Sequence, residues 1–109
     1  MEIDNINTYR KNIIDYVTRN FPGAVFCTPY AGSTREDGEQ VLIAAGENGF
    51  DLVCRFTWKG LNVHLEHCFE TWGSFYYVAL YDKGFAHRVE EYEDSHWKVA
   101  KFIREQANA

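Results

Sequence analysis

The stretch FDLVCRFTWKGLNVHLEHCF, residues 50–69, decides the fold because two alternating segments meet at one short turn. From Phe50 to Trp58 every second side chain is apolar, and the pattern repeats from Leu61 to Phe69 with a histidine as its one polar member. A period of two predicts β-strands that bury one face. With residues 59–60 as a two-residue hairpin loop, Trp58 pairs with Leu61 and the two apolar faces match.

This register divides the run HLEHC, residues 64–68, between the two faces of the sheet. A one-residue slip would turn one apolar face outward, so the register is well determined. Three side chains then point away from the core: His64, Glu66 and Cys68. His67 points toward the core, and we interpret it as a neutral, hydrogen-bonded histidine. The four side chains therefore cannot share one metal ion. The register also places Cys68 opposite Asp51, whose charge raises the thiol pKa.

The segments on either side predict two helices and more strands. Apolar residues follow helical spacing from Asn5 to Asn20, and again from Ser95 onward. Further strands are predicted at Ala24–Pro29, Glu39–Ala45, Ser74–Tyr81 and Phe85–Glu91. We therefore predict a single α+β domain over residues 1–109. It has an antiparallel sheet of five or six strands in a meander, with the N-terminal and C-terminal helices packed on one face.

Composition excludes several classes of function. The chain has 109 residues, a formal net charge of −5 and 17% aromatic residues. An acidic surface repels phosphate backbones and anionic headgroups, so we expect no direct nucleic-acid or membrane binding. The first residues lack the basic-then-apolar order of a signal peptide, and the three cysteines are widely spaced. Both features favour a cytoplasmic protein with free thiols.

No complete catalytic motif is present. The chain lacks a P-loop, a G-x-G-x-x-G fingerprint and a G-x-S-x-G elbow. Cys54 lies in the middle of an apolar face and is interpreted as a small core residue. We expect no cofactor and no metal. A small metal- or thiol-dependent hydrolase that uses His64, Glu66 and Cys68 is the alternative from another functional class.

Two segments are more typical of recognition than of chemistry. TPYAGSTREDGEQ, residues 28–40, is long for a connection between strands, and such loops are often functional. Its candidate contact residues are Tyr30, Arg35, Glu36 and Asp37. VEEYEDSHW, residues 89–97, crowds carboxylates among aromatic rings, with candidates Glu90, Glu91, Tyr92, Glu93, Asp94 and Trp97. The simpler interpretation of residues 28–40 is a loop without a partner. The simpler interpretation of the acidic residues is that carboxylates are favoured near a helix N-terminus. Tyr76 is a further candidate contact residue, because the fifth predicted strand carries apolar side chains on both faces.

These patterns predict a non-enzymatic protein-binding module. Its partner is expected to present a basic, nucleic-acid-binding surface to the carboxylates. In size and composition alone, the chain is typical of acidic phage or mobile-element inhibitors, such as anti-CRISPR proteins. A secretion-type chaperone or an immunity protein is a further alternative. Apolar groups on an uncovered sheet face also allow a homodimer through that face.

Overall fold

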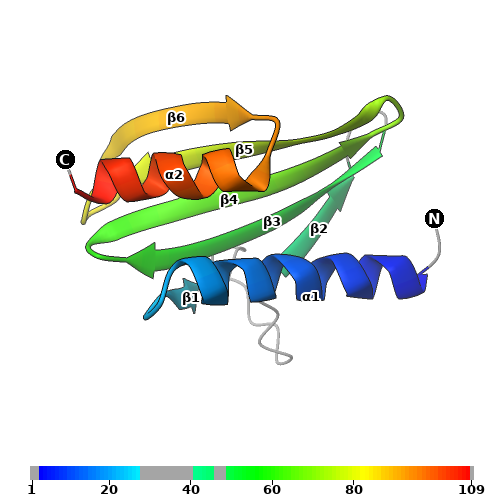
Figure 1. Ribbon diagram of the computed structural model, residues 1–109, viewed down its shortest axis with the longest axis horizontal. Coiled ribbons are helices and arrows are strands. Elements are labelled where there is room, and N and C mark those ends of the chain that lie inside the picture. Colours follow the sequence, from blue (N-terminus) through cyan, green and yellow to red (C-terminus); the bar gives the residue numbers. More distant parts are fainter. Residues whose placement is uncertain (1–2, 28–40, 46–48, 109) are drawn as a thin grey trace.

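The computed structural model describes residues 3–27, 41–45 and 49–108. Helix α1 (Ile3–Asn20) opens the chain and helix α2 (His96–Ala107) closes it. Between them lie six strands: β1 (Val25–Cys27), β2 (Val41–Ala45), β3 (Gly49–Trp58), β4 (Leu61–Glu70), β5 (Gly73–Tyr81) and β6 (His87–Glu93). All the strand pairs are antiparallel, and both helices lie on one side of the sheet (Figure 1). The predicted α+β fold is confirmed.

The central hairpin of β3 and β4 has the predicted register. Trp58 pairs with Leu61, and the ladder continues without a bulge to Gly49 and Glu70. Both loop residues have positive φ, 48° at Lys59 and 79° at Gly60. A two-residue turn with this backbone matches the twist of the strands that it joins. The short loop therefore determines which residues of β3 and β4 pair, and so which side chains share each face.

Strands β1 and β2 share one edge of the sheet. Cys27 pairs with Arg55, and Val41 pairs with Cys54, the next residue along β3. β1 and β2 therefore lie end to end along the same edge of β3. They do not form two successive strands of the sheet. From β3 to β6 the strands form the predicted meander. Residues 28–40 connect two neighbouring positions on this edge.

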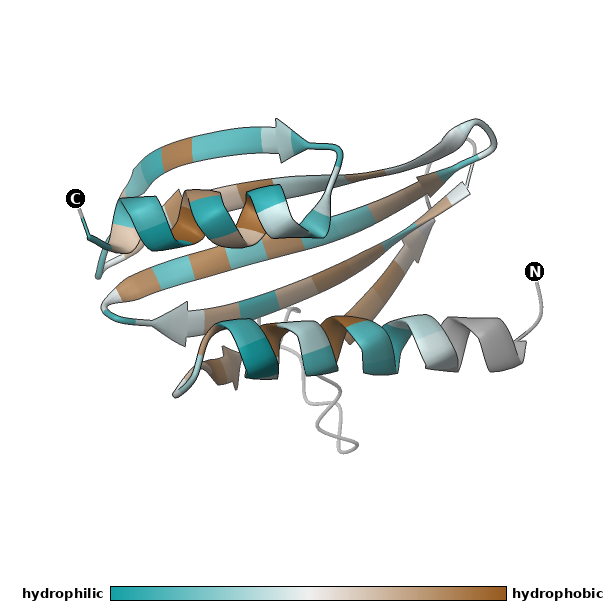
Figure 2. Ribbon diagram, in the orientation of Figure 1, coloured by the Kyte–Doolittle hydropathy of each residue, from teal (hydrophilic) through white to brown (hydrophobic). Residues whose placement is uncertain are grey.

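The core fills the space between the sheet and both helices. Side chains from β3, β4 and β5 alternate toward it, which Figure 2 shows as alternating hydrophobic and hydrophilic bands along β4. The fully buried members are Val17, Phe21, Val41, Leu52, Cys54, Phe56, Val63, Leu65, Val78, Leu80, Val99 and Ile103. Burial raises the pKa of the Cys54 thiol to about 12, as suits a core residue.

Hydrogen bonds fix the helices relative to each other and to the sheet. The Tyr16 hydroxyl on α1 donates to the His96 carbonyl at 2.6 Å, at the start of α2. The Trp58 indole donates to the Pro22 carbonyl at 3.0 Å, which ties the end of β3 to the turn after α1. Neither of the described helices is long and apolar enough to cross a membrane.

His67 lies on the helix-facing side, as predicted. Its ring stacks on Tyr76 at 4.2 Å and contacts Phe69 at 4.1 Å between centroids. Burial, with a smaller contribution from His96, lowers the pKa of His67 to about 4. The ring is therefore neutral at pH 7. Its buried Nε2 has no hydrogen-bond partner within the described part of the chain, so the expectation of a hydrogen-bonded histidine is wrong at this nitrogen.

Candidate functional site

The sheet face opposite the helices is covered by none of the described helices and strands. We call it the open face. Its side chains come from all six strands: β1 contributes Cys27, β2 contributes Leu42, and β3 to β6 contribute Asp51, Val53, Arg55, Asn62, His64, Glu66, Cys68, Phe75, Tyr77, Ala79, Tyr81, Glu90 and Tyr92. A sheet packed on one side normally keeps a polar outer face. Large exposed rings on such a face are typical of an interaction surface.

Four aromatic rings form a continuous cluster at one end of the open face. Trp72, in the turn between β4 and β5, stacks on Phe75 with centroids 5.7 Å apart and planes 1° apart. Phe75 contacts Tyr92 at 6.1 Å, and Tyr92 contacts Tyr77 at 4.9 Å. Trp72 is 71% exposed and Tyr92 is 67% exposed. We call these four residues the aromatic cluster.

Carboxylates near the cluster are held in place by hydrogen bonds. The Tyr77 hydroxyl donates a hydrogen bond to Glu90. This bond, with burial as a smaller cause, raises the pKa of Tyr77 above its ordinary value, so the hydroxyl stays protonated. Glu66 on β4 accepts a hydrogen bond from His64 at 2.8 Å. Negative charge is therefore fixed beside the exposed rings.

His64 links a cation to an anion. The Arg55 Nε donates to His64 Nδ1 at 3.0 Å, and because a guanidinium cannot accept, Nδ1 carries no proton in this pair. The proton of the neutral ring then lies on Nε2, which donates to Glu66 Oε2. Both ring nitrogens are occupied. In this arrangement His64 is not free to act as a general base.

Cys68 is a buried, protonated thiol. Burial and then the neighbouring Asp51 carboxylate raise its pKa to about 12, as the register predicts in direction. One ligand atom each from Asp51, Glu66 and Cys68 lies within 4.8 Å of the others, so these groups could share a cation once the thiol lost its proton. At neutral pH, the hydrolase arrangement of His64, Glu66 and Cys68 offers no activated nucleophile.

The acidic run precedes the last helix, as expected, but its glutamates belong to a strand that continues two residues beyond the predicted end at Glu91. Strand β6 extends to Glu93 because residues 89–93 pair with β5 from Leu80 to Tyr76. The first turn of α2 contains no acidic residue. Helix-dipole stabilisation therefore does not explain these glutamates, because they belong to the sheet ladder.

Strand alternation divides the acidic run between two faces. Glu90 and Tyr92 lie on the open face, whereas Glu91 and Glu93 lie on the helix-facing side. Asp94 follows the strand and pairs with Lys98 at 2.9 Å, and this bond lowers the pKa of the Asp94 carboxyl. The six residues predicted as one contact surface therefore do not form a single patch.

The remaining predicted contact residues lie elsewhere. Tyr76 faces the helices, where it stacks on His67. Trp97 is 57% exposed in the first turn of α2, away from the open face. The loop candidates Tyr30, Arg35, Glu36 and Asp37 fall outside the described residues.

Sequence reasoning did not select Trp72, Phe75 or Tyr77. The hairpin register carries a signal for two of them, because extending it into β5 places Phe75 opposite Cys68 and Tyr77 opposite Glu66. Trp72 lies in a turn, where alternation gives no face. Comparisons with protein-family models, with curated protein sequences and with solved structures find no match to this chain.

Proposed function

We propose that this chain is a non-enzymatic protein-binding module that contacts its partner through the open face. The observation that carries the proposal is the aromatic cluster, which is exposed on a sheet face that no described helix covers. Tryptophan and tyrosine are enriched among the residues that dominate binding energy at interfaces. Their rings already contact one another, so they lose little conformational freedom on binding.

The charge of the chain favours a basic partner. The formal net charge is −5, and Glu66 and Glu90 are held near the cluster by hydrogen bonds. Fixed carboxylates attract Lys- and Arg-rich surfaces and repel nucleic acid. Proteins that bind nucleic acid have basic surfaces of this kind. The specific form that we propose is an inhibitor of the phage or mobile-element type, which occupies its partner's nucleic-acid-binding surface.

A second copy of the same chain is a less suitable partner. Two open faces packed together would bring Glu66, Glu90 and Asp51 of each copy close to like charges. Among the described open-face residues named above, Arg55 is the one cation beside these three carboxylates, so most of the carboxylates would be desolvated without paired cations, which opposes such a dimer. A basic surface supplies those cations.

Adjacent glutamates on β6 provide a matched test. Glu90→Lys and Glu91→Lys change the net charge equally at exposed neighbouring positions, yet the side chains lie on opposite faces. Tagged wild-type chain and both variants are used as baits in a lysate of the organism that encodes the chain, and retained proteins are identified by mass spectrometry. We expect one basic protein to be retained by the wild type and by Glu91→Lys, and to be strongly depleted with Glu90→Lys. Its retention should fall as salt rises.

Further measurements separate charge from structure in this test. Glu90→Gln keeps an acceptor for Tyr77 but removes the charge, so an intermediate loss would assign the effect to electrostatics. Thermal melts show whether each bait is folded. Equal retention by Glu90→Lys and Glu91→Lys would contradict the proposal. Retention of an untagged copy of the chain in place of a basic protein would assign the open face to a homodimer.

A further inference from the structure

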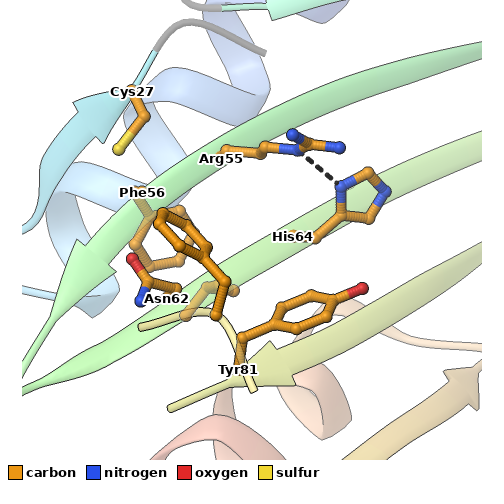
Figure 3. A pocket seen from close by; sticks show the side chains of 8 residues that line it. Cys27, Arg55, Phe56, Asn62, His64 and Tyr81 are labelled. Atoms are coloured by element: carbon orange, nitrogen blue, oxygen red, sulfur yellow. Dashed lines mark hydrogen bonds between the residues drawn. The ribbon is translucent and has the colours of Figure 1, made fainter. Parts of the chain in front are cut away.

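A pocket lies on the open face beside Arg55 and His64 (Figure 3). The His64 ring also contacts Tyr77 of the aromatic cluster, with centroids 6.0 Å apart. Its volume is about 380 Å³, within the lower part of the range of roughly 300–1,000 Å³ for small-ligand sites. The residues that the argument uses come from four strands and the turn after β5: Cys27, Arg55, Asn62, His64, Tyr81 and Phe85. No partner protein is needed to form it.

The polar feature of the pocket is a positioned guanidinium. The Arg55 Nε is bonded to His64, which is itself bonded to Glu66, so the orientation of the guanidinium is restrained before any ligand arrives. Within the described residues, no carboxylate lies within ion-pair distance of Arg55. Its terminal nitrogens are the donors that bind carboxylates in a bidentate manner.

The walls of the pocket are mostly apolar. Tyr81 and Phe85 contribute rings. Phe85 lies in the turn between β5 and β6 and is 76% exposed. Phe85 also has φ 67°, a left-handed conformation that is uncommon for a bulky residue. Asn62 is bonded to the Asp82 carbonyl at 3.1 Å, which ties this turn to β4. The pocket thus combines one cation with aromatic walls.

From this combination we infer that the pocket binds a small organic carboxylate with a flat apolar body. The carboxylate pairs with Arg55, and the body packs on Tyr81 and Phe85. A phosphate monoester is less suitable because it carries nearly two negative charges at neutral pH. Glu66 is hydrogen-bonded to His64 and the whole chain is acidic, so a single negative charge is repelled less than a double one.

Cys27 provides a reporter within the pocket itself. It is the exposed cysteine of the chain, whereas Cys54 and Cys68 are buried. An uncharged thiol reagent, N-ethylmaleimide, should therefore alkylate Cys27 first in the folded protein. A ligand in the pocket should slow this reaction in a saturable manner, as measured by mass spectrometry.

The probes are benzoate, phenylacetate and indole-3-acetate, each compared with its neutral amide. At least one carboxylate should protect Cys27 from alkylation. Its amide should need about tenfold more ligand for the same protection, which corresponds to about 1.4 kcal/mol. Arg55→Gln should weaken protection by a similar factor relative to its own ligand-free rate. Lys101→Gln, which removes a cation from exposed α2, should leave protection unchanged.

Three results would overturn the inference. They are absence of protection by every carboxylate at millimolar concentration, equal protection by acid and amide, and protection that persists in Arg55→Gln. The inference and the proposed protein partner fail separately, because this assay contains neither the aromatic cluster variants nor a partner.

Discussion

Replacing Phe56 by alanine should lower the free energy of unfolding by about 3–5 kcal/mol, because it removes a large ring from a core that cannot fully collapse around the cavity. Phe56 is 1% exposed and projects from β3 toward the helices. Its ring stacks on Phe21 at 5.3 Å and contacts Phe26 at 6.2 Å between centroids. The cavity would therefore separate the sheet from the turn that ends α1.

Phe85→Ala is the matched control for this substitution. It deletes the same ring at a position that is 76% exposed, where substitutions usually change stability by less than about 0.5 kcal/mol. Urea unfolding followed by circular dichroism measures both losses. Equal losses, or a loss for Phe56→Ala of only a few tenths of a kcal/mol, would show that the core does not lie on the assigned side of β3.

The second large effect concerns binding. Replacing both Trp72 and Tyr92 by alanine should weaken the partner complex by at least about 100-fold. Residues that dominate an interface contribute about 2 kcal/mol or more each, and about 1.4 kcal/mol corresponds to a tenfold change. Both side chains are largely exposed, so the melting temperature should change little. Isothermal titration calorimetry with the partner identified by affinity capture measures the loss.

Trp97→Ala is the control for the binding experiment. It removes an exposed ring of the same type from α2, on the other side of the molecule. We expect its affinity to remain close to that of the wild type. If Trp97→Ala abolished binding while the double variant bound normally, the contact surface would lie on the helix-facing side.

The sequence predicts the central hairpin well because two independent requirements agree there. The alternation of apolar and polar residues determines which side chains of β3 and β4 share a face. The two-residue loop determines which residues of the two strands pair. Those choices also predict that His67 separates from His64 and that Asp51 raises the pKa of Cys68. Each of these consequences depends on residues close together in the sequence.

The acidic run shows where such reasoning fails. Carboxylates ahead of a helix are favoured by the charge at its N-terminus, and carboxylates in an edge strand are also common. Only the pairing of residues 89–93 with β5 distinguishes the two cases. β1 and β2 share an edge because β3 is long enough to pair with both of them. The pocket is formed by side chains from several strands. Local patterns do not contain this information.

The measurement that tests the open face most directly is hydroxyl-radical footprinting of the partner complex. Oxidation of tryptophan and tyrosine side chains is quantified by mass spectrometry with and without the partner, so no substitution disturbs the fold. The open-face account predicts that Trp72 and Tyr92 become protected while Trp97 is oxidised at an unchanged rate. Protection of Trp97 with continued oxidation of Trp72 and Tyr92 would contradict it.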